Sequence, residues 1–236
     1  MKPGMKKITI FKSLGNIWSS MPESKKSQRA DNRGVQVKPF SAAVKFHGHV
    51  CPGLILGYRA SARALKELSS GISADEELVA IVENDTCAVD AIQAVTGCSI
   101  GKGNLIFRDL GKQVYTFAAR DSGKAIRIAI NPDFQIKDID PIYWDLRGKV
   151  LFGEPTAGER REVARRSKDV YKKMLGMPDK KLLLVTRVKI DIPEHAHLFK
   201  SLRCADCGEL VAEHRARVKN GKTVCIPCAG EYSRGW

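Results

Sequence analysis

PGLILGYRASARALKEL, residues 52–68, carries the clearest structural signal in the chain, because its apolar side chains recur at the spacing of one helical face. Pro52 suits the first turn of this helix, where a missing N–H leaves no hydrogen bond unmade. Next along the chain, Leu78–Val82 is a short apolar run rich in valine and isoleucine, which is typical of a buried strand. Polar residues then precede a second predicted helix at 87–95.

Strand signals dominate the following part of the chain. Runs of β-branched and aromatic residues separated by glycine-containing turns predict an antiparallel meander, and these runs are 105–108, 114–120 and 126–130. Residues 156–175 then predict a charged helix, and two further strands are expected at 182–186 and 188–192. Because helices precede most of the strands, we expect an α+β core of mixed helices and antiparallel sheet.

Length and charge divide the chain into three parts. It has 236 residues, of which 43% are hydrophobic, as expected for one main domain with a small satellite. Residues 1–39 form a basic leader with nine Lys or Arg against two acidic residues, and their lack of periodicity predicts disorder. We expect the core to span 40–193 and a zinc-binding module to span 194–236.

Apolar runs and cysteine usage indicate the compartment. The sequence lacks the run of roughly 18 apolar residues that a membrane span needs, and the roughly 7–15 of a signal-peptide core. Seven cysteines, four of them in two C-x-x-C pairs, suit metal ligation in a reducing compartment better than disulfides. We therefore expect a soluble, cytoplasmic protein without a membrane partner. Its net charge of +14 favours an anionic partner or serves solubility.

The C-terminal cysteines predict a structural zinc site. The two pairs are Cys204-x-x-Cys207 and Cys225-x-x-Cys228. Their separation of 17 residues lets two knuckles point four thiolates at one tetrahedral Zn²⁺, and Asn220-Gly221 between them suits a hairpin tip. Four thiolates fill the coordination sphere, so we expect a structural zinc ion in a zinc-ribbon-like module whose folding depends on the metal.

A second candidate site lies in the segment HGHVCP, residues 47–52. His47, His49 and Cys51 alternate, so an extended segment would project all three to one side, where they could share a metal ion. Cys51 and Cys87 each precede or begin a predicted helix, where the helix dipole stabilises a thiolate. We therefore predict either a core metal site at His47, His49 and Cys51, or a thiol site with Cys51 and Cys87 as catalytic groups. The alternative is that these side chains serve ordinary packing.

Longer strings resemble the FmdE family, which is named after a component of formylmethanofuran dehydrogenase. These strings are FHGHVCPG at 46–53, GYR at 57–59, ENDTCAVDAIQ at 83–93 and TGCSIGKGNL at 96–105. The zinc module, with Glu209, Glu213 and Arg217, extends the resemblance to the end of the chain.

The resemblance implies an α+β core with a metal or thiol site, an auxiliary treble-clef zinc finger and a homodimer. In the family's namesake complex, which reduces CO₂ onto methanofuran, redox chemistry belongs to subunits with a molybdenum or tungsten pterin and iron–sulfur clusters. This chain has no iron–sulfur cysteine run. The resemblance therefore implies an accessory or small-ligand- and metal-binding protein linked to one-carbon, molybdenum or tungsten enzyme metabolism, with oxidoreductase-complex subunits as partners.

Two other functions stay open. The cysteine spacing also resembles DksA/TraR zinc fingers, so the alternative is a regulator that binds nucleic acid or polymerase. Against it, the His-x-His-x-Cys segment has no use in such a regulator, and 7% aromatic residues offer few stacking platforms for bases. The third function is an adaptor whose charged surface at 160–173 and basic leader contact an acidic partner.

Overall fold

The computed structural model describes residues 35–231 and divides them between two compact units. The first unit ends at His195 and the second begins at Ala196. Most of the predicted leader lies outside the described residues, and only its end, 35–39, is seen as coil. Each helix in the described part of the chain is too short or too polar to cross a membrane.

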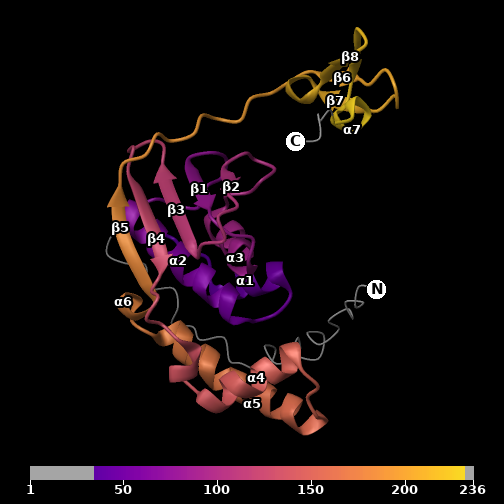
Figure 1. Cartoon of the computed structure of the whole chain (residues 1–236). Coiled ribbons are helices and arrows are strands. Elements are labelled where there is room, and N and C mark those ends of the chain that lie inside the picture. The colour runs from indigo at the N-terminus through magenta and orange to yellow at the C-terminus, as the bar shows by residue number, and fades with distance from the viewer. Residues whose placement is uncertain (1–34, 232–236) are drawn as a thin grey trace. The chain divides into compact units, whose positions relative to one another are not determined.

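The first unit combines helices with one five-stranded sheet (Figure 1). Its helices are α1 (Phe40–His47), α2 (Pro52–Leu68), α3 (Cys87–Thr96), η3 (Ile136–Asp138), α4 (Pro141–Phe152), α5 (Ala157–Gly176) and α6 (Asp179–Leu182). Its strands are β1 (Leu78–Val82), β2 (Leu105–Phe107), β3 (Val114–Ala119), β4 (Ala125–Ile130) and β5 (Leu183–Val188). The strand order is β2-β1-β3-β4-β5, and this mixture confirms the predicted α+β class.

Helices α1, α2 and α3 lie together on one face of the sheet (Figure 1). Alternate residues of β1, namely Leu78, Ala80 and Val82, join them in the buried core, since every second strand residue shares a face. α2 and α3 pack at close range, because a Cβ on Gly57 would lie 2.2 Å from the carbonyl oxygen of Ala88. Glycine is therefore required at this crossing.

The predicted meander is correct for β3 and β4 but wrong for β2. β3 pairs antiparallel with β4 across the turn at 120–124. β2 instead pairs in parallel with β1, with Leu105 opposite Ala80. The cause is α3, which carries the chain back to the starting end of β1 before β2 begins.

The prediction of two strands at 182–186 and 188–192 is also wrong. A single strand, β5, runs over Leu183–Val188, and Leu182 belongs to α6. β5 pairs with β4 until Val188 lies opposite Ala125, the first residue of β4. Because β4 offers no further partner, the chain leaves the sheet at this point.

Helices α4 and α5 form a hairpin (Figure 1), and the first of them is absent from the sequence-based prediction. Asp140 caps α4 and also pairs with Arg166 of α5 at 2.8 Å. Arg59 of α2 donates hydrogen bonds to the carbonyl oxygens of Met174 and Leu175 at 2.9 and 2.7 Å. These bonds satisfy carbonyls of the last turn of α5 and hold that turn against α2.

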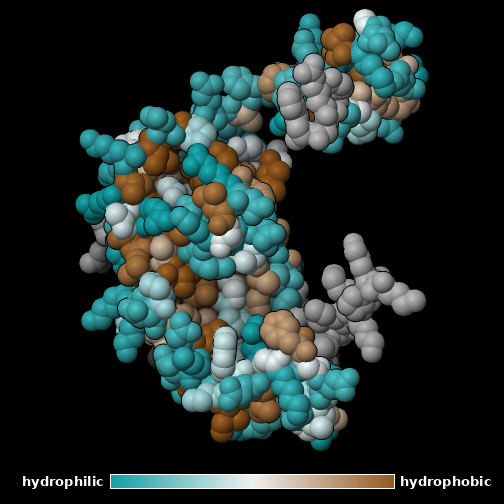
Figure 2. Space-filling model, viewed as in Figure 1, coloured by the Kyte–Doolittle hydropathy of each residue, from teal (hydrophilic) through white to brown (hydrophobic). Residues whose placement is uncertain are grey.

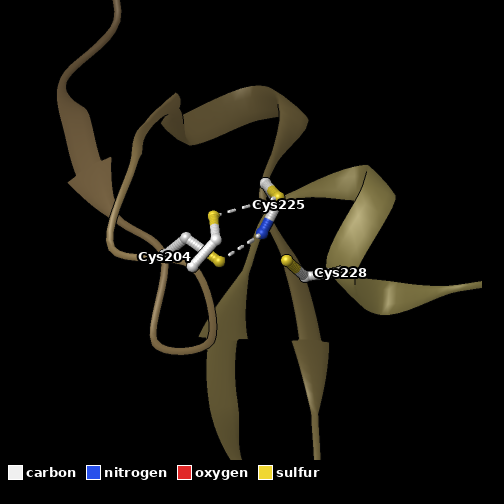
Figure 3. Close-up of side chains that lie close together, drawn as sticks. Cys204, Cys225 and Cys228 are labelled. Atoms are coloured by element: carbon white, nitrogen blue, oxygen red, sulfur yellow. Dashed lines mark hydrogen bonds between the residues drawn. The ribbon is translucent and has the colours of Figure 1, made fainter.

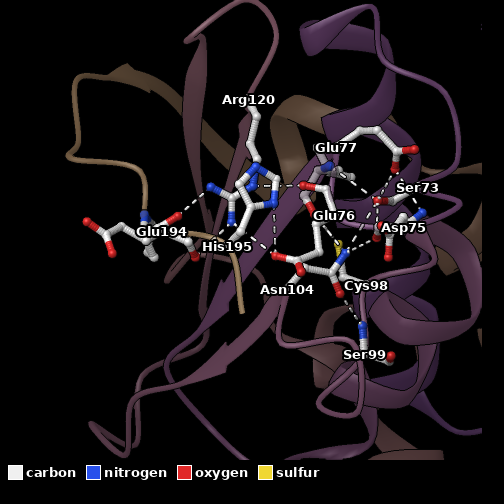
Figure 4. A network of polar contacts seen from close by, with 12 residues as sticks. Ser73, Asp75, Glu76, Glu77, Cys98, Ser99, Asn104, Arg120, Glu194 and His195 are labelled. Carbon is white, nitrogen blue, oxygen red and sulfur yellow. Dashed lines mark hydrogen bonds and ion pairs between the residues drawn. The ribbon is translucent and has the colours of Figure 1, made fainter. Parts of the chain in front are cut away.

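A polar network fixes the start of β1 and the chain that leaves the sheet (Figure 4). Asn104 donates to carbonyl oxygens in and just before β1. Arg120 donates from Nε to the Glu76 carbonyl at 2.8 Å and from Nη2 to the Glu194 carbonyl at 3.1 Å. His195 is 70% exposed, and its Nδ1 lies 3.3 Å from a Glu76 carboxylate oxygen. The end of the first unit is therefore tied to its own sheet.

The second unit is built from two antiparallel hairpins and a short helix. Its elements are β6 (Ser201–Arg203), β7 (Leu210–Ala212), η4 (Glu213–Arg215), β8 (Arg217–Lys219), β9 (Lys222–Val224) and α7 (Ile226–Ala229). Asn220 and Gly221, between β8 and β9, have φ angles of 50° and 74°. These left-handed angles fit the tight hairpin tip that Asn-Gly predicts.

On the face of the first unit seen in Figure 2, hydrophobic surface is broken into patches by hydrophilic side chains. Exposed apolar side chains of this unit include Trp144, Phe152 and Leu184. Single exposed apolar residues are normal on protein surfaces. The chemically distinctive features of the described chain are instead two clusters of cysteine and histidine side chains.

Candidate metal and thiol site in the core

Two helix N-termini meet at the core site. Cys51 is the N-cap of α2, and its Sγ accepts a hydrogen bond from the Leu54 N–H at 3.3 Å. Cys87 is the first residue of α3. A Cβ on Gly53 would lie 3.3 Å from the Cβ of Cys87, so the two helix starts are in contact. Both sulfurs thus lie at the positive ends of helix dipoles, which favour a thiolate.

His47, the last residue of α1, completes this cluster. Its Nδ1 lies 2.7 Å from Oδ2 of Asp90, and its Nε2 lies 3.8 Å from Sγ of Cys51. With Nδ1–H donating to the carboxylate, the Nε2 lone pair is directed at the sulfurs. One ligand atom from each of His47, Cys51 and Cys87 lies within 4.8 Å of the others.

His49 lies outside this group of close ligand atoms in the described chain. The premise of an extended His-x-His-x-Cys segment is wrong, because His47 ends a helix and Gly48 takes a left-handed φ of 91°. The His49 ring instead lies against the His47 ring, with centroids 4.4 Å apart. Burial, and then the electrostatic effect of the neighbouring His47, lower the pKa of His49.

The two thiols of the core site titrate very differently. A hydrogen bond from Cys51 lowers the pKa of Cys87 to about 6, against the opposing effect of burial. The same hydrogen bond and burial raise the pKa of Cys51. The pair therefore loses its first proton from Cys87, and Cys51 keeps its proton as the donor. A nucleophile or metal ligand is thus available on Cys87 at neutral pH.

Asp90 is a site residue without an assigned role in the sequence-based prediction. It lies three residues after Cys87 on α3, so both side chains project from the same face of that helix. A carboxylate on the outer nitrogen of a histidine is the arrangement that orients metal-ligating imidazoles in many proteins. The i, i+3 spacing of Cys87 and Asp90 was the signal in the sequence that could have indicated Asp90. The packing of α1 against α3 brings His47 to Asp90 as its partner.

The C-terminal cysteines form a second cluster, in the second unit (Figure 3). One Sγ atom from each of Cys204, Cys207, Cys225 and Cys228 lies within 4.8 Å of the others. The Cys225 N–H donates to Cys204 Sγ at 3.3 Å, and backbone N–H groups near Cys204 lower its pKa to about 6. This donor set fits Zn²⁺ in a closed structural site.

Together, these features define a class of protein: an α+β unit with a partly buried thiol–imidazole site, joined to a four-cysteine zinc-finger-like unit. The family model described as "FmdE, Molybdenum formylmethanofuran dehydrogenase operon" matches residues 46–184. The model of the prokaryotic dksA/traR C4-type zinc finger matches residues 198–234. The chain belongs to the FmdE family and carries a C-terminal C4 zinc finger, which indicates bound zinc.

One curated relative is named a probable S-adenosyl-L-methionine-binding protein, from Archaeoglobus fulgidus. It is 34% identical over 195 residues, which cover 80% of this chain and 52% of the relative. The chain therefore spans about half the length of that relative.

A solved structure shows the same fold. It is an FmdE-like protein of the tungsten formylmethanofuran dehydrogenase type from Syntrophus aciditrophicus, with a TM-score of 0.53 and 24% identity. The match covers 80% of this chain and 89% of that chain.

Proposed function

We propose that this chain is a metal-binding accessory protein whose core site, His47, Cys51 and Cys87, holds a divalent transition ion and presents it to a small ligand. One observation carries the proposal: His47 is oriented by Asp90 so that its free nitrogen faces the two sulfurs. An imidazole and two thiolates suit Zn²⁺ and neighbouring divalent ions.

The residues of the core site have different roles. His47, Cys51 and Cys87 would hold the ion, and three protein ligands leave one position of a tetrahedral sphere open. The bound ion would supply Lewis-acid polarisation of a ligand atom. Asp90 fixes the tautomer and orientation of His47, and the N-terminus of α2 stabilises negative charge on Cys51.

Family membership supports a role as an accessory protein for one-carbon enzymes. The matching family model and the fold neighbour are both named for formylmethanofuran dehydrogenases of molybdenum or tungsten. We propose that the chain serves such one-carbon enzymes by binding a metal ion or small ligand for them. The four-cysteine finger is a separate closed site, so it supplies structure to the second unit and the ligand-binding role falls to the core site.

Metal content per chain tests this proposal. Elemental analysis of the untagged protein should give about two metal ions per chain, one in each cysteine cluster. A variant with both His47→Ala and Cys51→Ser should retain about one, whereas His49→Ala should retain both. A parent protein with one ion, unchanged in the double variant, would contradict the core metal site.

S-adenosyl-L-methionine binding is a second candidate function, because the Archaeoglobus fulgidus relative is named for it. Equilibrium dialysis with labelled S-adenosyl-L-methionine tests it, with S-adenosyl-L-homocysteine as competitor. Saturable binding at one site per chain supports the function in this shorter chain. Absence of saturable binding would contradict this function for the present chain.

A further inference from the structure

The two cysteines of the core site differ in their exposure to solvent. Cys51 is only 6% exposed, and its Sγ accepts a hydrogen bond from the Leu54 N–H at 3.3 Å. Cys87, at the first position of α3, is partly exposed. A reagent from solution therefore reaches Cys87 first, whereas Cys51 is placed to react with a group already held on Cys87.

The sulfurs of Cys51 and Cys87 are close enough to form a bond after a small movement. Their Sγ atoms lie within 4.8 Å of each other. A disulfide holds its sulfurs about 2.05 Å apart, so the two atoms must approach by less than about 3 Å. The backbones are already close, because a Cβ on Gly53 would lie 3.3 Å from the Cβ of Cys87. The bond therefore needs local movement at the two helix starts rather than a change of fold.

Cys98, the third cysteine of the first unit, has a different environment. It lies beyond the C-terminal end of α3, and this ten-residue helix, about 15 Å long, separates it from Cys87. Its Sγ donates to the carbonyl oxygen of Leu78 at 3.3 Å, and the residue is fully buried. Among residues 35–195, Cys51 and Cys87 are therefore the cysteines that are placed to form a disulfide.

We infer that Cys51 and Cys87 form a dithiol–disulfide exchange site whose substrate is a low-molecular-weight disulfide. Cys87 is the attacking group because it is the more exposed of the two, and Cys51 is the resolving group because it is buried beside Cys87. An accessible attacking sulfur with a second sulfur within reach is the arrangement that this exchange requires. The activity goes beyond the proposed function, because it needs no metal ion.

The exchange takes place in two steps that balance. In the first, the sulfur of Cys87 bonds to one sulfur of the small disulfide, whose S–S bond breaks, and one small thiol leaves with the proton given up by Cys87. In the second, the sulfur of Cys51 bonds to Sγ of Cys87, the mixed disulfide breaks, and the second small thiol leaves with the proton of Cys51. Two electrons and two protons thus pass from the protein to the small disulfide.

Metal binding and the disulfide would exclude each other at this site. The thiolate is the form of cysteine that binds a metal ion, and neither sulfur is a thiolate once the two are bonded together. An ion held by His47, Cys51 and Cys87 would therefore block the exchange, and oxidation would release the ion. This coupling rests on the proposed function, whereas the exchange itself does not.

Hydroxyethyl disulfide, a small neutral compound, tests the exchange on full-length protein freed of core metal. Peptide mass spectrometry locates the mixed adduct and the protein disulfide. The variants are Cys51→Ser and Cys87→Ser. Cys98→Ser is the matched control in the same unit, because serine can still donate to the Leu78 carbonyl. The measurement on the parent needs no substitution, so it tests the inference even where a variant does not fold.

The parent should form the Cys51–Cys87 disulfide, and its mixed adduct should be at least about tenfold scarcer than in Cys51→Ser, because proximity favours the intramolecular step. Cys51→Ser should keep a lasting adduct on Cys87, whereas Cys87→Ser should leave Cys51 unmodified. Cys98→Ser should match the parent. A lasting adduct on Cys87 of the parent, with Cys51 still free, would overturn the exchange site and leave the metal site intact.

Two further results would separate the parts of the inference. Labelling of Cys51 in Cys87→Ser as fast as labelling of Cys87 in Cys51→Ser would overturn the assigned order of attack. Zn²⁺ added before the reagent should slow formation of the disulfide at least about tenfold once most chains are loaded. An unchanged rate in excess Zn²⁺ would contradict the core metal site of the proposed function, while the exchange activity would stand.

Discussion

At the core site, a single carboxylate determines what the imidazole can do. Asp90 holds Nδ1 of His47, so that Nε2 is the nitrogen left to face Cys51 and Cys87. Sequence spacing brought attention to the correct segment, 47–51, but chose His49 as the third ligand. The extended backbone that this choice assumed is absent, because Gly48 turns the chain sharply after α1. Cys87, predicted at the start of its own helix, lies within 4.8 Å of the ligand atoms of His47 and Cys51, because the starts of α2 and α3 are in contact.

Asp90→Asn should weaken metal binding at the core site by about 10–100-fold, the usual effect of losing an outer partner of a ligand. The amide keeps the size of the side chain but is a poorer acceptor for the His47 N–H. Competition with a chromophoric chelator measures the affinity. Asp85→Asn, an exposed change on the loop just before α3, is the control and should match the parent. Equal loss in both variants would argue against a specific role for Asp90.

Alkylation of Cys87 by iodoacetamide, in protein freed of core metal, should accelerate as pH rises through about 6 and level off near neutrality. The alkylation rate rises with pH because the thiolate is the reactive form. The rise ends near neutrality because the pKa of Cys87 lies below the usual value of 9.0. Cys51→Ala removes the donor and should move the midpoint upward, whereas Cys51→Ser keeps a donor and should leave it low. Peptide mapping separates Cys87 from the other cysteines. A midpoint near 9 in the parent would contradict the coupling.

Among secondary-structure elements, the crossing of α2 and α3 positions the site, because it brings Cys51 and Cys87 together. Helical periodicity was sufficient to predict α2, and capping residues were sufficient for the start of α5 at Thr156. The pairing of β2 was missed, because strand runs look alike whether their partner is parallel or antiparallel. α4 was missed although Asp140 and a following proline are present, since its apolar residues show no single helical face.

Gly57→Ala should destabilise the first unit by about 1–3 kcal/mol, the usual range for overpacking a core. The added methyl would meet the Ala88 backbone at 2.2 Å, so the helices must separate. Thermal and urea unfolding measure the change. Gly148→Ala within α4 meets no atom within 4 Å and should instead stabilise by about 0.5–1 kcal/mol. Similar effects of both substitutions would contradict the close crossing.

For the whole molecule, the two units have separate sources of stability. The first unit has a continuous buried core, whereas the second has short hairpins around four cysteines. Such a small unit cannot bury enough apolar surface alone, so metal binding supplies much of its folding free energy. The spacing of the cysteines was sufficient to predict from the sequence that the second unit depends on a metal ion. Homodimer formation stays a prediction.

Removal of zinc with a strong chelator should therefore unfold the second unit and leave the first folded. Hydrogen exchange should show loss of protection over 201–229, with protection retained in β1 and β3. Cys204→Ser should reproduce the pattern without chelator, whereas Cys51→Ser should not. Simultaneous loss of protection in both units would show that they are energetically one body.

Anomalous diffraction from crystals of the full-length protein, measured on both sides of the absorption edge of the bound metal, tests the core metal site most directly. Two peaks are expected in the difference map, one among the four C-terminal cysteines and one in the core. The core peak should lie about 2.0–2.1 Å from Nε2 of His47 and about 2.3 Å from the sulfurs of Cys51 and Cys87. A single peak at the C-terminal cysteines, with none beside His47 in fully loaded protein, would contradict a metal ion held by His47, Cys51 and Cys87.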